Sequence, residues 1–292
     1  MSLSIPDWSA TELQIMRIGL GFVVIKTFSR MLILRPAHNL RHPVGLARLV
    51  NLRPMGSRLV VKGLQYGAFV AALCYAAGRL VPFALAYLSV ALILEATYRS
   101  SDGSVDHGDH LLAAVLVAQT AATIVWNAAD RWSWDLGALS ADSQQATAVW
   151  WSIQAIAAVY FTSGLSKLIN TGGRWIGRST RLLLAGYGRL ETQRMTGKGS
   201  LAAGREAAGI RNAEIALSAL SSRLRLAQCV FAAGLIIELA APIGLLGEAV
   251  MMAAGLGLIA LHVGNQVLLR LPFPEYQLLV LIYFVNLPRL LW

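Results

Sequence analysis

The sequence predicts an all-α, polytopic membrane protein, a single bundle of about eight transmembrane helices. Only 14% of its 292 residues are charged and 56% are apolar, whereas roughly a quarter of the residues in a soluble domain are charged. The mean hydropathy is +0.58. The apolar residues form long blocks, close to the roughly 20 residues that cross a bilayer as a helix, and do not alternate as they do in soluble proteins.

Eight segments are long and apolar enough to be spanning helices. They are residues 12–34, 59–78, 80–97, 110–127, 147–168, 226–246, 249–269 and 276–291. The segment 80–97 is short, which suits a tilted or partly re-entrant helix. The first segment carries Arg17 and Lys26, so we expect one of its sides to face protein or the membrane interface. We find no second domain and no clean internal repeat, and treat residues 1–292 as one transmembrane domain.

The charge distribution predicts the orientation in a bacterial-type inner membrane. The net charge is +10. Residues 35–62 hold six basic and no acidic residues, and residues 167–225 hold eleven basic and three acidic ones. Because Lys and Arg accumulate in cytoplasmic loops, both segments are expected in the cytoplasm. Four predicted spans separate them, which places them on one side, and the acidic loop with Asp130, Asp135 and Asp142 falls on the other.

The long basic loop, residues 169–225, has two parts. Residues 178–194 have the leucine and tyrosine spacing of an amphipathic helix on the inner leaflet. Residues 196–209 are rich in Gly and Ala, and we expect no fold of their own. The basic residues flank apolar spans, which favours membrane lipids over nucleic acid as the partner. Cys74 and Cys229 lie in apolar segments, so neither a disulfide nor a metal site is predicted.

The first candidate site is the Asp-His-Gly-Asp-His stretch at residues 106–110, where the fourth helix begins. His107 or His110 could move a proton, and Asp109 could orient the imidazole. The alternative is a solvated helix start in which an aspartate complements the helix dipole. A His-x-x-His pair can also hold a metal, but no third ligand is near in the sequence.

The second candidate is Lys167, at the end of a segment that begins with Tyr160 and contains Ser163 and Gly164. A lysine desolvated in the membrane can act as a base. The alternative is a lysine that only extends its ammonium group to the cytoplasmic interface.

The third candidate combines Glu238 in the sixth predicted helix with His262 and Asn265 in the seventh. His262 and Asn265 are three residues apart and share a helix face. Together the three could form a proton relay or hold the polar head of a ligand. The alternative is an interhelical hydrogen bond that only stabilises the bundle.

Taken in order, these clusters resemble the HTTM family, whose transmembrane domain is shared with the vitamin K-dependent γ-carboxylases. Residues 106–110 are similar to the family's Asn-His segment, and residues 126–134 with Asp135 to its aromatic-polar loop. Residues 160–168, followed by Trp175 and Gly177, resemble its Tyr-x-x-Ala-Gly-x-x-Lys-Leu block, with Ser163 in place of Ala. His262-x-x-Asn265 and then Leu271, Phe273 and Tyr276 resemble its His-x-x-Asn and Phe-Pro-Tyr block.

The resemblance implies an enzyme that acts on a quinol or isoprenoid-like lipid. Lys167 would deprotonate a reduced naphthoquinone of the vitamin K or menaquinol type, with His107 assisting, and O2 would then react to give an epoxide and a strong base. The expected reaction is an oxygenation, an epoxidation or a related carboxylation. It would be a lyase or oxidoreductase activity that needs no metal. The residues expected to bind the cofactor are His262, Asn265, Glu238, Tyr160, His110 and Asp109. No segment after the last span matches the lumenal domain of the animal carboxylases, so carboxylation of a protein glutamate by their route is not expected.

Two other interpretations stay open. The chain could be a non-catalytic membrane partner, either an SdpB-like peptide maturation factor or a DoxX-like subunit of a redox complex, with residues 167–225 as its docking surface. A transporter is the third interpretation, with Pro82, Pro242 and Pro272 as candidate helix breaks.

Overall fold

The computed structural model describes residues 6–33, 49, 51–101, 107–129, 143–195, 203–269, 271, 273–287 and 289. All the elements in these ranges are helices. The α-helices are α1 (Ala10–Ile33), α2 (Arg58–Ala76), α3 (Val81–Ser101), α4 (His107–Ala129), α5 (Ser143–Thr171), α6 (Ser179–Met195), α7 (Ala203–Ser221), α8 (Leu224–Ala240), α9 (Glu248–Leu269) and α10 (Pro274–Tyr283). Short 3₁₀ turns are η2 (Arg53–Gly56), η3 (Ile176–Arg178) and η4 (Ala241–Leu246). The all-α prediction is confirmed for the described ranges.

Within the described residues, six helical segments are long and apolar enough to cross a membrane. They are Arg58–Ala76, Val81–Arg99, Asp109–Ala128, Ser143–Thr171, Leu224–Leu246 and Glu248–Leu269. They match six of the eight predicted spans. The other two predicted spans are not confirmed. The described part of α1 carries Arg17, Lys26 and Arg30, and α10 has 10 residues, or about 15 Å at 1.5 Å per residue, half of a roughly 30 Å hydrocarbon core.

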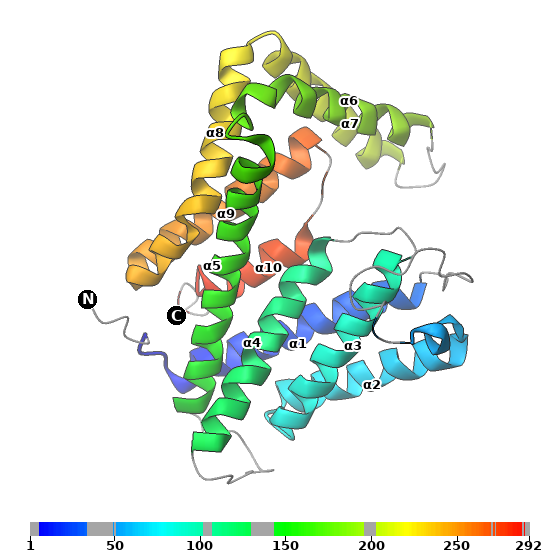
Figure 1. Cartoon of the computed structure of the whole chain (residues 1–292), viewed down its shortest axis with the longest axis vertical. Helices are drawn as coiled ribbons and strands as arrows, with labels where there is room; N and C mark the ends of the chain where they lie inside the picture. The colour runs from blue at the N-terminus through cyan, green and yellow to red at the C-terminus, as the bar shows by residue number, and fades with distance from the viewer. Residues whose placement is uncertain are drawn as a thin grey trace.

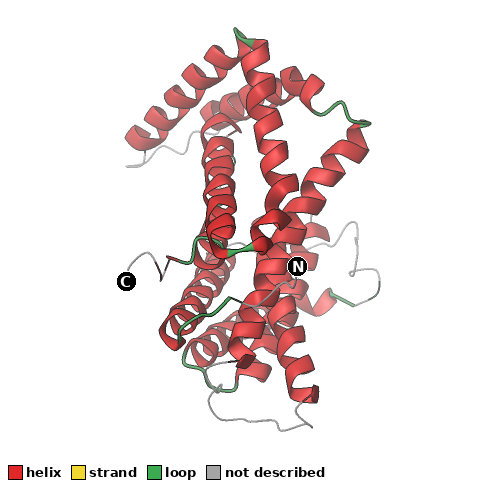
Figure 2. Cartoon of the chain, turned by 90° about the vertical axis from the view of Figure 1, so that its left-hand side faces the viewer, coloured by secondary structure: helices red, strands yellow, loops and turns green. Residues whose placement is uncertain are grey.

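The helices form two groups joined by α5 (Figure 1). α1 to α4 and α10 lie in the lower group of that view, and α6 to α9 in the upper one. The 29-residue α5 runs through both and packs against α4 on one side and against α8 and η4 on the other. Seen from the side, the described part of the chain is helical from one end of the molecule to the other (Figure 2). The long α5 helix therefore connects the two groups of helices.

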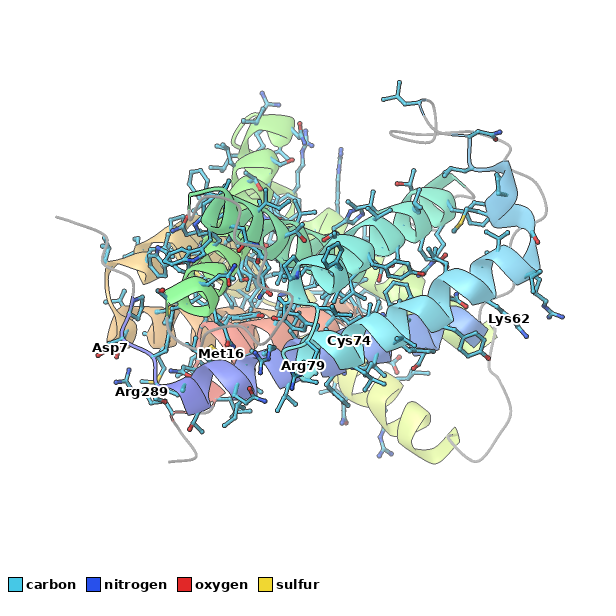
Figure 3. All side chains as sticks on the ribbon, turned by 90° about the horizontal axis from the view of Figure 1, so that it is seen from below. Asp7, Met16, Lys62, Cys74, Arg79 and Arg289 are labelled. Atoms are coloured by element: carbon cyan, nitrogen blue, oxygen red, sulfur yellow. The ribbon has the colours of Figure 1, made fainter. Side chains whose placement is uncertain are left out.

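Described residues near the two ends of the sequence lie together at one end of the lower group. Asn286 donates a hydrogen bond from Nδ2 to Oε1 of Glu12 at 2.9 Å, and Arg289 pairs with Glu248. Seen from below, Asp7 and Arg289 lie at one end of the bundle and Lys62, near the start of α2, lies at the other (Figure 3). The start of α2 therefore lies at the end of the bundle away from Asp7 and Arg289.

A buried polar network ties the lower group together. Gln119 on α4 accepts a hydrogen bond from the Tyr75 hydroxyl at 2.7 Å. Its Nε2 donates to Ser152 Oγ at 3.0 Å and to the Tyr283 hydroxyl oxygen at 2.8 Å. All four side chains are buried. One glutamine therefore links α2, α4, α5 and α10 inside an apolar core.

α6 and α7 pack against each other around a small core of their own. Its buried members are Leu183, Leu190, Ala213, Leu217, Leu220 and, from α8, Ala227. The helix predicted over 178–194 is confirmed by α6, although its place on the inner leaflet stays a prediction. The expectation of no fold over 196–209 is wrong for residues 203–209, which form the first turns of α7, because their alanines favour a helix. Residues 196–202 lie outside the described ranges.

Candidate functional site

A cavity of about 690 Å³ lies between α5, α8 and α9 in the upper group. In Figure 1, α8 and α9 diverge from η4 towards α6 and α7, with α5 beside them. Ala185 and Gly186 of α6 also line the cavity, as do Phe273 and Tyr276 at the start of α10. The volume lies within the roughly 300–1,000 Å³ of typical small-molecule sites. Most of the lining is apolar, and its charged side chains and its histidine come from α5, α8 and α9.

The strongest charges in the cavity are those of Lys167 and Glu238. The Nζ atom of Lys167 donates to both carboxylate oxygens of Glu238, each at 2.5 Å. Gly164 lets the two helices approach, because a Cβ there would lie 3.1 Å from Leu239 Cγ and 3.2 Å from Glu238 Cβ. The ring of Trp175 lies 5.4 Å from Nζ, within cation–π range. Lys167 is therefore held by an ion pair and an aromatic face.

A second pair of polar side chains lines the same cavity. The Tyr160 hydroxyl and His262 Nε2 are 2.5 Å apart, and both side chains are buried. The rings of Phe273 and Tyr276 surround His262, with centroids at 5.4 and 5.2 Å. Among the described residues, His262 Nδ1 has no hydrogen-bond partner. An unpaired buried nitrogen is costly, so a polar ligand atom at this position would be favoured.

Five of the predicted site residues therefore come together. Tyr160 and Lys167 on α5, Glu238 on α8, and His262 and Asn265 on α9 all line this one cavity. They come from three helices, of which α5 is far from the consecutive α8 and α9 in the sequence. Glu238 and His262, which the sequence offered together with Asn265 as one relay, have separate partners instead: Glu238 pairs with Lys167, and His262 with Tyr160.

Asp109 and His110, the predicted site residues at the start of α4 whose side chains the structure describes, do not line the cavity. Asp109 is buried and pairs with Arg99 of α3 through Oδ2 and Nη1 at 3.0 Å, while His110 is exposed. Glu95, also buried, lies one turn before Arg99 on α3. This arrangement matches a helix start stabilised by an acidic first turn.

The first two residues of the Asp-His-Gly-Asp-His stretch lie at the edge of the described residues. His107 is the first residue of α4, but its side chain and the whole of Asp106 lie outside the described residues. The same holds for residues 130–142, most of the aromatic-polar loop. Nearby, Asn127 accepts a hydrogen bond from Gln144 Nε2 at 3.0 Å.

Several lining residues were not predicted. They are the apolar wall of α8, with Phe231 and Gly234, and Ala185 and Gly186 of α6. No local signal distinguishes them from other apolar residues, because their role depends on which helices pack together. In the described ranges, no group of three or more His, Cys, Asp or Glu side chains is arranged to hold a metal ion.

No family model, no curated protein and no solved structure matches the chain. The cavity and its two polar pairs are therefore the features that indicate a function.

Proposed function

We propose that this chain is an integral membrane enzyme that binds a quinol or isoprenoid-like lipid and removes a proton from its polar end. The supporting observation is that one apolar cavity, between helices able to span a membrane, contains both the Lys167–Glu238 and the Tyr160–His262 pairs. Buried ionisable groups are costly at membrane depth and usually mark a functional site. The proposal includes eight crossing segments, basic loops in the cytoplasm of a bacterium, and kinship with the HTTM family.

Lys167 and Glu238 can share one proton between them. As an ion pair the two side chains have no net charge, which lowers the cost of placing them in an apolar wall. Passing a proton from the Lys167 ammonium to the Glu238 carboxylate leaves a neutral amine and a neutral acid. The amine can then take a proton from a bound hydroxyl group, which makes Lys167 the base and Glu238 its proton store.

Tyr160 and His262 are proposed to hold the head of the ligand. The Tyr160 hydroxyl contacts Nε2 of the imidazole at 2.5 Å, so the open Nδ1 is the atom left to bind a ligand oxygen. Asn265, on the same side of α9 and also in the cavity wall, can add a donor or an acceptor.

The residues present fit a reduced naphthoquinone. The cavity offers aromatic side chains around an unpaired polar atom, with the rings of Tyr160 and Tyr276 centred 6.0 Å apart beside His262. When bound, such a quinol would supply the electrons for a reaction with O2. His107 stays a proposed assistant in proton transfer, on the strength of the resemblance alone.

The proposal is tested by the lipids that stay with the purified protein. We expect mass spectrometry to find a quinone or isoprenoid lipid with the wild type, and we expect Lys167→Ala to retain it while losing all turnover. The exposed Arg181→Ala on α6 serves as the matched control and should keep turnover. Turnover of the isolated lipid by Lys167→Ala would disprove the base assignment.

A second candidate function is that of a non-catalytic membrane partner. The specific observation is that α6 and α7 lie at the edge of the bundle with Leu184 and Ile215 exposed, at 64% and 62%. Such side chains suit contact with a protein or with lipid. A partner protein that co-purifies with the wild type, and is lost in Leu184→Ser with Ile215→Ser, would favour this function if no lipid is bound.

A further inference from the structure

The cavity has a polar end and an apolar end. Lys167, Glu238, Tyr160 and His262 define the polar end. On α8, the lining residues from Val230 to Ile237 are all apolar, and they extend for about 12 Å along the helix at 1.5 Å per residue. Phe231 and Leu268, both in the lining, also pack against the core of α6 and α7. The apolar end therefore lies beneath the α6–α7 pair.

α9 marks the boundary between the two ends. His262 and Asn265 share one face of this helix, and Leu261, Gly264 and Leu268 share the neighbouring face at spacings of three and four residues. All five line the cavity. A ligand with a polar head and an apolar chain can therefore contact both faces at once.

Gly264 is unusual among the glycines of the lining. A Cβ added at Gly234 would lie 2.9 Å from Leu261 Cδ1, and one at Gly186 would lie 3.1 Å from the Leu268 carbonyl oxygen. Those two glycines allow close helix packing. A Cβ added at Gly264 would meet no atom of the described residues within 4 Å. Glycine disfavours a helix interior, so its presence here is not explained by packing.

We propose that Gly264 sets the capacity of a hydrocarbon compartment formed by α6, α8 and α9, and so limits the chain length of the bound lipid. The inference rests on the proposed function for the nature of the head group only. A side chain at position 264 would occupy the space where the chain leaves the head and turns along α8. A long or bulky hydrocarbon chain then no longer fits in the compartment, whereas a short chain still fits.

The test compares Gly264→Leu with Gly63→Leu in the purified full-length protein. Gly63 is also helical, and a Cβ there likewise meets nothing among the described residues, but it lies on α2, outside the lining of the cavity. The probes are naphthoquinones with short and with long prenyl chains, and the corresponding prenyl alcohols, which lack the quinone. Binding is measured as quenching of tryptophan fluorescence, and thermal unfolding verifies that each variant is folded.

We expect Gly264→Leu to weaken binding of long-chain probes by roughly tenfold or more, the usual result of overfilling a packed site, and to leave short-chain binding within about threefold. Gly63→Leu should match the wild type, and Gly264→Ala should lie between. An equal loss for short and long chains, no loss for either, or no binding of any probe to the wild type would overturn the inference. Prenyl alcohols that bind as tightly as naphthoquinones and show the same chain-length effect would support the role of Gly264. They would contradict the proposal that the head group is a quinol.

Discussion

The Nζ atom of Lys167 lies 2.5 Å from both carboxylate oxygens of Glu238. The side chain of Glu238 is 7% exposed and that of Lys167 is 28% exposed, so the carboxylate is the more deeply buried member. The pair joins the last turns of α5 to α8. The ion pair therefore links two helices and contains the main charged groups of the cavity.

Removing one member of this ion pair should lower the free energy of unfolding more than replacing both members by apolar residues. Glu238→Gln leaves an ammonium group against an apolar wall, and we expect the free energy of unfolding to fall, towards the lower end of the roughly 3–5 kcal/mol that loss of one buried partner costs. Replacing both, Lys167→Met with Glu238→Leu, should restore most of it. Reversible unfolding in mixed detergent micelles measures the difference. A double variant as unstable as Glu238→Gln would show that the pair stabilises the fold by itself.

Tyr160→Phe tests the second pair. The change removes one oxygen and leaves His262 Nε2 without its partner at 2.5 Å, so we expect a loss of about 1–3 kcal/mol in the free energy of unfolding. Tyr66→Phe removes the same atom from an exposed tyrosine on α2 and should change it by less than about 0.5 kcal/mol. Equal effects of the two changes would mean that the contact with His262 contributes nothing.

The sequence predicted helices well because long apolar blocks dominate it. Each of the eight predicted spans overlaps a helix, but composition did not show that α10 ends at Tyr283 after 10 residues. In the site, Lys167, Glu238 and His262 were found because ionisable groups are rare in apolar blocks. Their pairing was not, since it depends on how α5, α8 and α9 pack. Asp109, chosen by the same rule, pairs with Arg99 elsewhere.

Uncharged polar residues within or next to the apolar blocks are a second signal in the sequence. Gln119 and Gln145 both lie within predicted spans or next to one, and both are buried. Gln145 donates to the Leu13 carbonyl at 2.6 Å and accepts from Arg17 at 3.4 Å. A buried glutamine requires partners on other helices, so it predicts a contact, although not which helix supplies it.

Gln119→Leu should loosen the lower group of helices. The change leaves the hydroxyls of Tyr75, Ser152 and Tyr283 without the amide that they share. Unsatisfied buried groups cost about 1–3 kcal/mol each, and we expect a loss at the upper end of that range in the free energy of unfolding. Gln154→Leu, at an exposed position of α5, is the matched control and should have little effect. A result in which both variants are equally stable would exclude a structural role for the network.

Glu275 connects the start of α10 to α1. Its Oε1 lies 3.5 Å from Lys26 Nζ and 3.2 Å from Arg30 Nη2. The next residue, Tyr276, contacts His262 in the cavity with ring centroids 5.2 Å apart. The position of one wall of the cavity therefore depends on ion pairs between α10 and α1, within the lower group of helices.

Loss of Glu275 should destabilise the protein less than loss of both of its basic partners. The Glu275 side chain is 2% exposed, whereas Lys26 and Arg30 are 33% and 40% exposed. Glu275→Gln leaves two cations that water can reach, so we expect a loss of at most about 1 kcal/mol. The double change Lys26→Gln with Arg30→Gln leaves a buried carboxylate without a counter-charge and should cost roughly 3–5 kcal/mol, while either single change should cost little because the other base remains. Hydrogen exchange at the start of α10, together with the free energy of unfolding, measures both effects. Equal losses for the acid and for the pair of bases would show that burial of Glu275 does not govern the strength of this link.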